Sequence, residues 1–337
     1  MNFLFSLINY KSKQSNNFII TLFFILFSIL FSTSAIAAET NEALNLLNKM
    51  GKAVQTSDYQ IHFLSQDRDQ FATTFEYNHL GAAKKENINA QLLYLEGPAK
   101  EIILHNNTTS YFQPDSPSFS IASSRITEAF PDVVYNDFNS LASIYDFILL
   151  GKTRTANRSV QLVKVLAKDR DRYSYVIWID DENFLPLRID LVDDDNDIVN
   201  QLKVLDIDAS FDAKKFKNYI DNRTYPILLS IEKQNNLLDA WRLAWLPKGF
   251  KEIAAYNVNF YSSDIATKLF SDGVFSFTVN VSLEQASQSN QLIQQGGRTI
   301  FSTNLGNKNI IIIGNLPEAT IERIAQNIVE KSPETSR

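Results

Sequence analysis

The chain has 337 residues, carries 38 acidic against 32 basic side chains, and contains no Cys. Its formal net charge of −6, without a visible basic stripe, disfavours binding to DNA or RNA. Because Cys is absent, the chain has no disulfide, no thiolate metal site, no catalytic thiol and no Cys that could carry a bacterial lipid anchor.

The first 37 residues have the three parts of an export signal. Lys11 and Lys13 precede an apolar run from Phe18 to Phe31, and small residues follow it. The run is shorter than the ~20 residues that a spanning helix needs, so we expect cleavage near Ala37 rather than a retained membrane anchor. Removal of the signal leaves about 300 residues with a net charge of about −8, which is enough chain for two domains.

An amphipathic helix is predicted over residues 41–55, because apolar and small residues, among them Leu47, Met50 and Val54, recur on one face. The periodicity then changes to two, as in β-strands. Strands of the first domain are predicted at residues 59–65, 71–77, 89–96, 100–105, 109–113, 147–154, 159–167, 172–180, 186–191 and 199–207. A less regular segment, 121–144, is predicted as a loop with a short helix around Phe138 to Tyr145.

Short polar turns between these strands are typical of an antiparallel meander. A long twisted sheet must curl to cover its apolar face or close on a helix. The fold class predicted is therefore α+β and mainly β: an unclosed antiparallel β-barrel that encloses helices, followed by a smaller sheet domain.

The polar stretch 211–224 breaks the strand pattern and is predicted as the linker. Strands follow at 250–261, 266–271, 274–282, 298–305 and 309–314, and a final helix begins near Pro317 with Ile321, Ile324 and Ile328 on one face. The predicted organisation is a signal peptide (1–37), a barrel domain (38–210), the linker, a small α+β domain (225–332) and a polar tail (333–337).

No residue pattern predicts catalysis, a metal or a cofactor. His62, His79 and His105 are isolated from one another, and a zinc site needs three or four converging ligands. The acidic turn 193–197 lacks the Gly and Glu of a calcium loop and is predicted to be a solvated hairpin. Gly-x-Ser-x-Gly and glycine-rich phosphate motifs are absent as well.

Aromatic residues are concentrated in the first domain. Each can fill the core, but an open barrel also leaves inward side chains that can bind an acyl chain or a hydrophobic peptide. The candidates for an apolar pocket or partner-binding surface are Tyr111, Phe112, Tyr135, Phe138, Tyr145, Phe147, Tyr175 and Trp178. In the second domain the candidates for a contact surface are Trp245 and Phe250.

Several motifs keep one order along the chain: Tyr135-x-Asp137-Phe138, the stretch 145–193, Trp245-Leu246-Pro247-Lys248-Gly249-Phe250, and the run 269–277. In this order the chain resembles the RseB/MucB regulators of the sigma-E envelope stress response. The N-terminal domain of that family is in turn similar to the lipoprotein carriers LolA and LolB. Asn157 stands where the family often has a small residue or Gly, and Asn tolerates the left-handed backbone of such a turn.

The resemblance implies a soluble periplasmic protein, not an enzyme, that binds the periplasmic segment of a membrane-spanning, RseA/MucA-like anti-sigma factor and shields it from proteolysis. Lipopolysaccharide, lipoprotein acyl chains or another envelope stress signal would release that segment. The alternative is a soluble periplasmic lipid or lipoprotein carrier, for which residues 38–210 would suffice. A hydrolase is a third and less favoured hypothesis. The sequence does not determine whether the chain forms a homo-oligomer.

Overall fold

The computed structural model describes residues 41–82, 84, 87–229, 238, 240–260, 263–283, 291–295 and 297–330. The predicted signal peptide and the polar tail lie outside the described residues. All of the long strands predicted for both domains are present.

The first domain is built on an eleven-stranded sheet in which neighbouring strands are antiparallel throughout. Its order is β6-β5-β4-β3-β2-β1-β11-β10-β9-β8-β7, so β6 and β7 are the two edges. The strands are β1 (Tyr59–Asp67), β2 (Thr73–Leu80), β3 (Asn89–Tyr94), β4 (Glu101–His105), β5 (Thr108–Phe112), β6 (Phe119–Ala122), β7 (Tyr145–Thr155), β8 (Arg158–Ala167), β9 (Ser174–Asp180), β10 (Pro186–Val192) and β11 (Ile198–Ile207).

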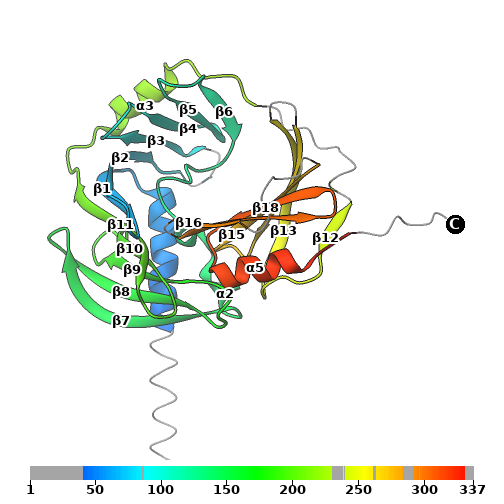
Figure 1. The fold of residues 1–337 in the computed structure, drawn as a ribbon. Coiled ribbons are helices and arrows are strands. Elements are labelled where there is room, and N and C mark those ends of the chain that lie inside the picture. The colour runs from blue at the N-terminus through cyan, green and yellow to red at the C-terminus, as the bar shows by residue number, and fades with distance from the viewer. Residues whose placement is uncertain are drawn as a thin grey trace, which may run out of the picture.

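This sheet curls around helical segments, as Figure 1 shows. The helix of residues 41–56 lies against its concave face, and Leu47, Met50 and Val54 are completely buried there. The 3-10 helix η2 (Asp132–Tyr135) and the helix α2 (Phe138–Leu141) bury further apolar residues in the same core. The predicted fold class, an unclosed antiparallel barrel that encloses helices, is confirmed for the first domain.

A helix occupies the segment that was predicted to be a linker. Helix α3 (Ala213–Asp221) begins at Asp212, whose carboxylate accepts a hydrogen bond from the backbone N–H of Lys215 over 2.9 Å. Phe216 and Ile220 on its apolar face pack on Leu80 and Ile103 of the large sheet, on the side away from the main core. The helix was not predicted from the sequence, because most of its residues are polar and only Phe216 and Ile220 are buried on its apolar face.

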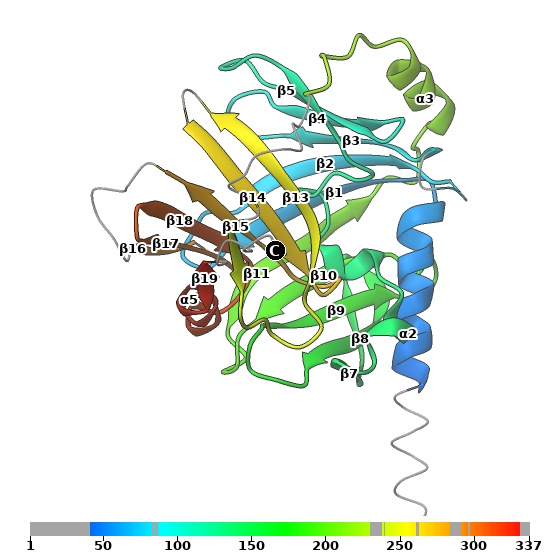
Figure 2. The same cartoon turned by 90° about the vertical axis from the view of Figure 1, so that its right-hand side faces the viewer.

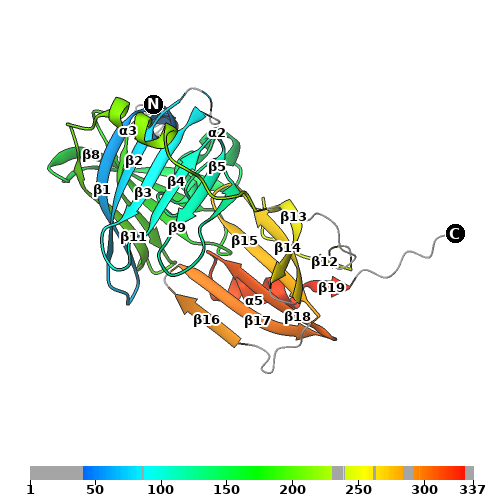
Figure 3. The same cartoon turned by 90° about the horizontal axis from the view of Figure 1, so that it is seen from above.

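The second domain has a six-stranded antiparallel sheet in the order β13-β14-β15-β18-β17-β16. Helix α5 (Glu318–Gln326) packs against it, and Figure 3 shows this domain beside the barrel. The strands are β13 (Lys251–Phe260), β14 (Ser263–Ser271), β15 (Ser276–Ser282), β16 (Gln291–Gln295), β17 (Arg298–Leu305) and β18 (Lys308–Gly314), with a separate ribbon of β12 (Trp241–Leu243) and β19 (Ile328–Glu330).

Several predicted boundaries were wrong. The short helix ends at Leu141, and Tyr145 begins strand β7 instead of closing that helix. Strand β2 begins at Thr73, so Phe71 lies before it and is 99% exposed. The final helix ends at Gln326, and Ile328 pairs with Leu243 in the ribbon. Strands β6, β12, β16 and β19, each of five residues or fewer, were not predicted.

Candidate functional site

The two domains meet at a buried cluster of polar and charged groups, which we call the interdomain joint. Its centre is an ion pair between Arg172 and Asp272, whose side chains are both fully buried. Arg172 Nη2 also donates to the carbonyl O of Lys248 over 2.8 Å, and Tyr145 Oη donates to Asp272 Oδ2 over 2.5 Å. Asp169 accepts from Arg172 Nε and Nη2 and thereby holds the guanidinium from its own domain. Groups from both domains therefore share one hydrogen-bond network.

A tight turn orients Asp272 for this contact. Asp272 Oδ1 accepts from the backbone N–H groups of Val274 and Phe275 over 2.9 and 2.8 Å, which leaves Oδ2 for Arg172. Gly273 follows with a φ of 101°, and a Cβ there would lie 2.9 Å from Asn136 Oδ1. Asn136 Nδ2 donates to the Gly273 carbonyl over 2.8 Å, so the turn is also bound to the first domain.

Aromatic rings surround the ion pair. Tyr175 of the first domain stacks on Phe275 of the second with ring centroids 5.3 Å apart, and the Arg172 guanidinium lies 5.1 Å from the centre of the Phe250 ring. Burial, and then the negative charge of Asp272, raises the pKa of Tyr145, so its hydroxyl stays protonated and donates. The side chains of the central ion pair are therefore shielded from solvent, and each of the two charges has a partner.

A cleft with a volume of about 350 Å³ runs between the domains beside the joint. Five buried side chains on its first-domain side are apolar or aromatic: Ala129, Phe130, Tyr175, Leu191 and Leu202. Charged and polar groups also line it, among them the exposed Glu128 and Arg298. The lining residues are Ser65, Asp67, Thr127, Glu128, Ala129, Phe130, Pro131, Tyr175, Leu191, Asn200, Leu202, Gln295, Gly297, Arg298 and Asn315.

The second domain closes the cleft at a point of close approach. A Cβ on Gly297 would lie 2.4 Å from Leu191 Cδ2 and 3.6 Å from Val199 Cγ1, so the backbone there lies directly against strands β10 and β11. Gln294 Nε2 donates to the hydroxyl of Tyr173 over 3.0 Å nearby. An open groove with an apolar floor, polar walls and backbone on both sides suits an extended peptide that places an apolar side chain inward.

The structure does not gather the predicted aromatic residues into one cavity. Phe138, Tyr145, Phe147 and Tyr175 are buried in the main core, with Phe138 and Phe147 in an edge-to-face contact at 5.7 Å. Of these, Tyr145 belongs to the joint, and Tyr175 belongs to both the joint and the cleft. Tyr135 lines a small polar pocket next to His79 and Arg125.

Other predicted residues lie against cations outside the cleft. Trp178 lies under the Arg188 guanidinium at 4.4 Å, and Phe112 lies under that of Arg223 at 4.3 Å. Tyr111, which is half-buried, stacks on Phe119 at 4.8 Å. In the second domain, Phe250 is buried in the joint, whereas Trp245 stacks with Arg323 at 3.8 Å.

Sequence reasoning missed Arg172 and Asp272. Arg172 was predicted to lie in a strand, but it lies two residues before β9. Only its contacts with residues that are distant in the sequence reveal its role. Asp272 lies between the predicted strands 266–271 and 274–282, inside the run 269–277 that carries the family resemblance. An Asp-Gly pair in an otherwise apolar run signals a turn, but not its partner.

A second pocket lies on the outer face of the large sheet, between the strands and helix α3, with a volume of about 560 Å³. Gln60, Asn78, Gln91 and Glu101 line its floor, and hydrogen bonds join them in a row in which Glu76 links Gln60 to Asn78. These groups already satisfy one another to a large extent, and no described residue of the second domain lines the pocket. The interdomain cleft is therefore the better candidate site.

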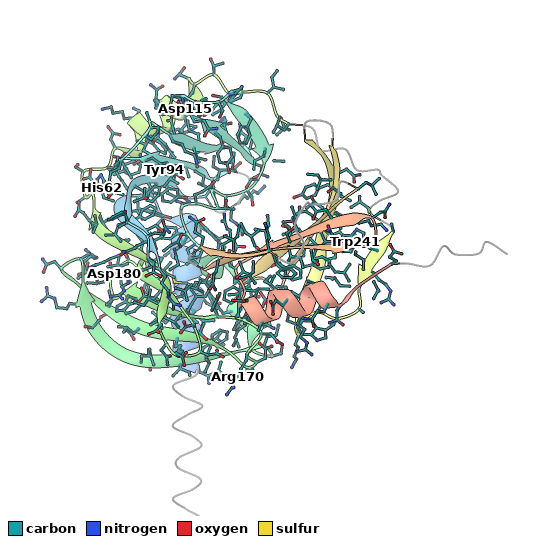
Figure 4. All side chains as sticks on the ribbon, in the orientation of Figure 1. His62, Tyr94, Asp115, Arg170, Asp180 and Trp241 are labelled. Atoms are coloured by element: carbon teal, nitrogen blue, oxygen red, sulfur yellow. The ribbon has the colours of Figure 1, made fainter. Side chains whose placement is uncertain are left out.

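The described residues offer little to other functions. No three His, Asp or Glu side chains gather among them as a metal site would require. His62, labelled in Figure 4, lies 3.5 Å from Glu76, His79 bonds the Ser57 carbonyl, and His105 bonds Asn89 and Asn106. None of the helices in this part of the chain is long and apolar enough to cross a membrane.

Comparison with known proteins identifies relatives over most of the chain. Residues 42–235 match the model of the MucB/RseB N-terminal domain, and residues 235–329 match that of the MucB/RseB C-terminal domain. The chain is 35% identical over 305 residues to the sigma-E factor regulatory protein RseB of Escherichia coli K12, covering 89% of this chain and 94% of that protein. It is 36% identical to the RseB of Haemophilus influenzae over 89% of this chain and 95% of that protein.

A solved structure shares the fold. The complex of MucA and MucB from Pseudomonas aeruginosa contains a chain that aligns with a TM-score of 0.69 and 20% identity, over 87% of this chain and all of that chain. At this identity the likeness shows a common fold. The two-domain architecture is therefore shared as a whole, with both domains in the same order.

Proposed function

The chain belongs to the MucB/RseB family, and on this premise we propose that it is a periplasmic negative regulator of a sigma-E-type envelope stress response. In this role it binds the periplasmic segment of a membrane-spanning anti-sigma factor and shields that segment from regulated proteolysis. Its relatives carry names of regulatory proteins, so we propose binding without catalysis as the activity of this chain.

The cleft between the domains is the observation that carries the proposal. It combines an apolar floor of Phe130, Leu191 and Leu202 with a polar and charged rim, and its volume of about 350 Å³ can take apolar side chains of a bound segment. A segment bound there would lose the freedom to enter a protease, because a protease must bind its substrate as an extended strand. Because both domains line the cleft, we expect binding to require the second domain as well as the first.

The experiment mixes the mature protein with the purified periplasmic segment of its cognate anti-sigma factor and measures the complex by calorimetry. Cleavage of the segment by the initiating protease is then followed with and without the protein. We expect a stable complex and slower cleavage. No measurable complex and no protection would overturn the proposal.

A matched pair of substitutions tests the site. Ser65 and Gln66 are adjacent on β1, but alternate residues of a strand point to opposite faces, and only Ser65 lines the cleft. We expect Ser65→Trp to fill the cleft and weaken binding more than about tenfold, or about 1.4 kcal/mol. Gln66→Trp, on the exposed face, should leave the affinity unchanged. Equal effects of the two substitutions would place the segment elsewhere.

The alternative carrier function lacks a comparable observation. The hollow of the barrel, where an acyl chain would enter, is filled by the helix of residues 41–56 and by segments that include Phe130 and Phe138. We therefore do not propose lipid transport. Release of the bound segment on sensing lipid stays a prediction from the resemblance, and it requires that the lipid favours the released state by differential affinity.

A further inference from the structure

We propose that the ion pair of Arg172 and Asp272 fixes the relative position of the two domains and thereby sets the shape of the cleft, so that both are positioning residues for the anti-sigma segment. The inference rests on the proposed function for its ligand, but its structural part concerns this chain alone.

Several of the contacts between the domains come from one short piece of the first domain. Residues 169–175 supply Arg172 to Asp272 and to the Lys248 carbonyl, Tyr175 to Phe275, and Tyr173 to Gln294. Asp171 in the same piece lies 3.7 Å from Arg323 of helix α5. This segment enters strand β9, and its position is therefore fixed by the large sheet.

The chemistry of Arg172 makes the joint directional. A guanidinium donates in a fixed planar fork, so its bonds to Asp169 on one side and to Asp272 and the Lys248 carbonyl on the other hold only at one orientation of the second domain. Apolar packing alone would tolerate small rotations, whereas a fully buried charge without its partner is strongly unfavourable. The joint therefore favours one arrangement of the domains over its neighbours.

The same piece of chain connects the joint to the cleft. Tyr175 stacks on Phe275 in the joint and also lines the cleft floor. Gln295, Gly297 and Arg298, which form the second-domain wall, follow the residue that bonds Tyr173. A rotation of the second domain at the joint therefore changes the separation of the cleft walls.

The test uses the full mature chain with two introduced Cys residues, which is straightforward because the native sequence has none. Spin labels at the exposed positions of Gln66→Cys and Ala319→Cys report the distance between the domains by pulsed electron resonance. A second pair, Gln66→Cys and Thr153→Cys, lies within the first domain and reports whether that domain stays folded.

The variant combines Arg172→Met with Asp272→Asn, which removes both charges and leaves neither stranded. The new amide oxygen still accepts from Val274 and Phe275, so the turn persists. We expect the interdomain distance to change from one narrow distribution to a broad one, and the distance within the first domain to stay the same. If the binding-competent arrangement falls to about one tenth of the population, the affinity for the anti-sigma segment falls about tenfold.

A matched control applies the same two changes to Arg188 and Asp190, an ion pair within the first domain. This control should keep the narrow interdomain distance and the affinity of the unmodified protein. Arg172→Lys keeps the charge but not the planar fork, and it should broaden the interdomain distance in a variant that remains folded.

A narrow interdomain distance in both Arg172 variants would overturn the proposal. A broadened distance with unchanged affinity would overturn the connection between the joint and the cleft. If the unmodified protein binds no segment at all, the proposed function fails, while the distance measurements still decide whether Arg172 and Asp272 fix the domains.

Discussion

At the scale of single residues, His79 is a buried imidazole whose surroundings oppose protonation. Its ring stacks on Tyr59 with centroids 4.7 Å apart, and its Nδ1–H donates to the carbonyl O of Ser57 over 2.9 Å. Burial lowers its pKa to about 4 despite that hydrogen bond, whereas in an unfolded chain the pKa is near 6.5.

This shift predicts a dependence of stability on pH. Between about pH 6.5 and pH 4 the unfolded state binds a proton at His79 and the folded state does not, so the free energy of unfolding decreases as the pH falls. The decrease from this residue amounts to about 3 kcal/mol. Urea unfolding at several pH values should show this slope in the unmodified protein and a shallower slope in His79→Gln. Parallel slopes would contradict the prediction.

At the scale of elements, the hairpin between β7 and β8 has a tight turn with an unusual residue in it. Ala156 and Asn157 both have positive φ, at 47° and 58°. A two-residue hairpin of this type matches the twist of the strands and favours Asn and Gly. Asn157 is suited to it, as expected from the sequence, whereas Ala156 carries a Cβ in the left-handed region without any compensating polar group.

Ala156→Asn should therefore stabilise the protein. The left-handed backbone costs Ala about 1 kcal/mol, and part of this, about 0.5 kcal/mol or more, is recovered by a side chain that tolerates the conformation. Ala156→Val is the matched control and should destabilise, because β-branching is incompatible with positive φ. Thermal unfolding measures both. A Val variant as stable as the Asn variant would show that the turn can change its conformation freely.

Helix α3 shows a different relation between an element and its surroundings. Its Lys-rich surface favours solvent, whereas Phe216 and Ile220 pack on the outer face of the large sheet and the Tyr219 hydroxyl donates to Glu101 of β4. Arg223, two residues beyond the helix, adds an ion pair with Glu101. The element belongs to the first domain by these contacts, and Figure 2 shows it against the end of the sheet that carries β3 and β4.

At the scale of the whole molecule, the joint couples two domains that each have a sheet and helices of their own. Interdomain contacts within a chain are commonly small and polar, which permits relative motion. Here the contact includes a buried ion pair, the stack of Tyr175 on Phe275, and Phe250 beneath the guanidinium. Separating the domains would expose these rings and charges together, so we expect them to unfold together.

Calorimetry tests this coupling. We expect one cooperative transition for the unmodified protein and two for Phe275→Ala, which removes the aromatic contact between the domains. Phe301→Ala, in the core of the second domain and outside the joint, should lower the transition temperature and leave a single transition. Two transitions in the unmodified protein, or one in Phe275→Ala, would show that the joint does not couple the domains.

The alternation of apolar residues was sufficient to locate the strands of both sheets, the enclosed helix of residues 41–56 and the final helix. These elements depend on local periodicity, which a sequence displays directly. The same local signal located the turns at Asn157 and at the acidic hairpin after Val192. It failed at helix α3 and at the shortest strands, because these are stabilised by contacts with distant parts of the chain.

The sequence by itself was therefore sufficient for the fold class and, through the order of its motifs, for the family. It also predicts the export signal. It did not determine which aromatic residues face a ligand, because periodicity places a side chain on a face without saying what covers that face. Only the tertiary structure brought Arg172 to Asp272, 100 residues further along the chain. Such a pairing depends on how the second domain docks on the first, and no local pattern contains that information.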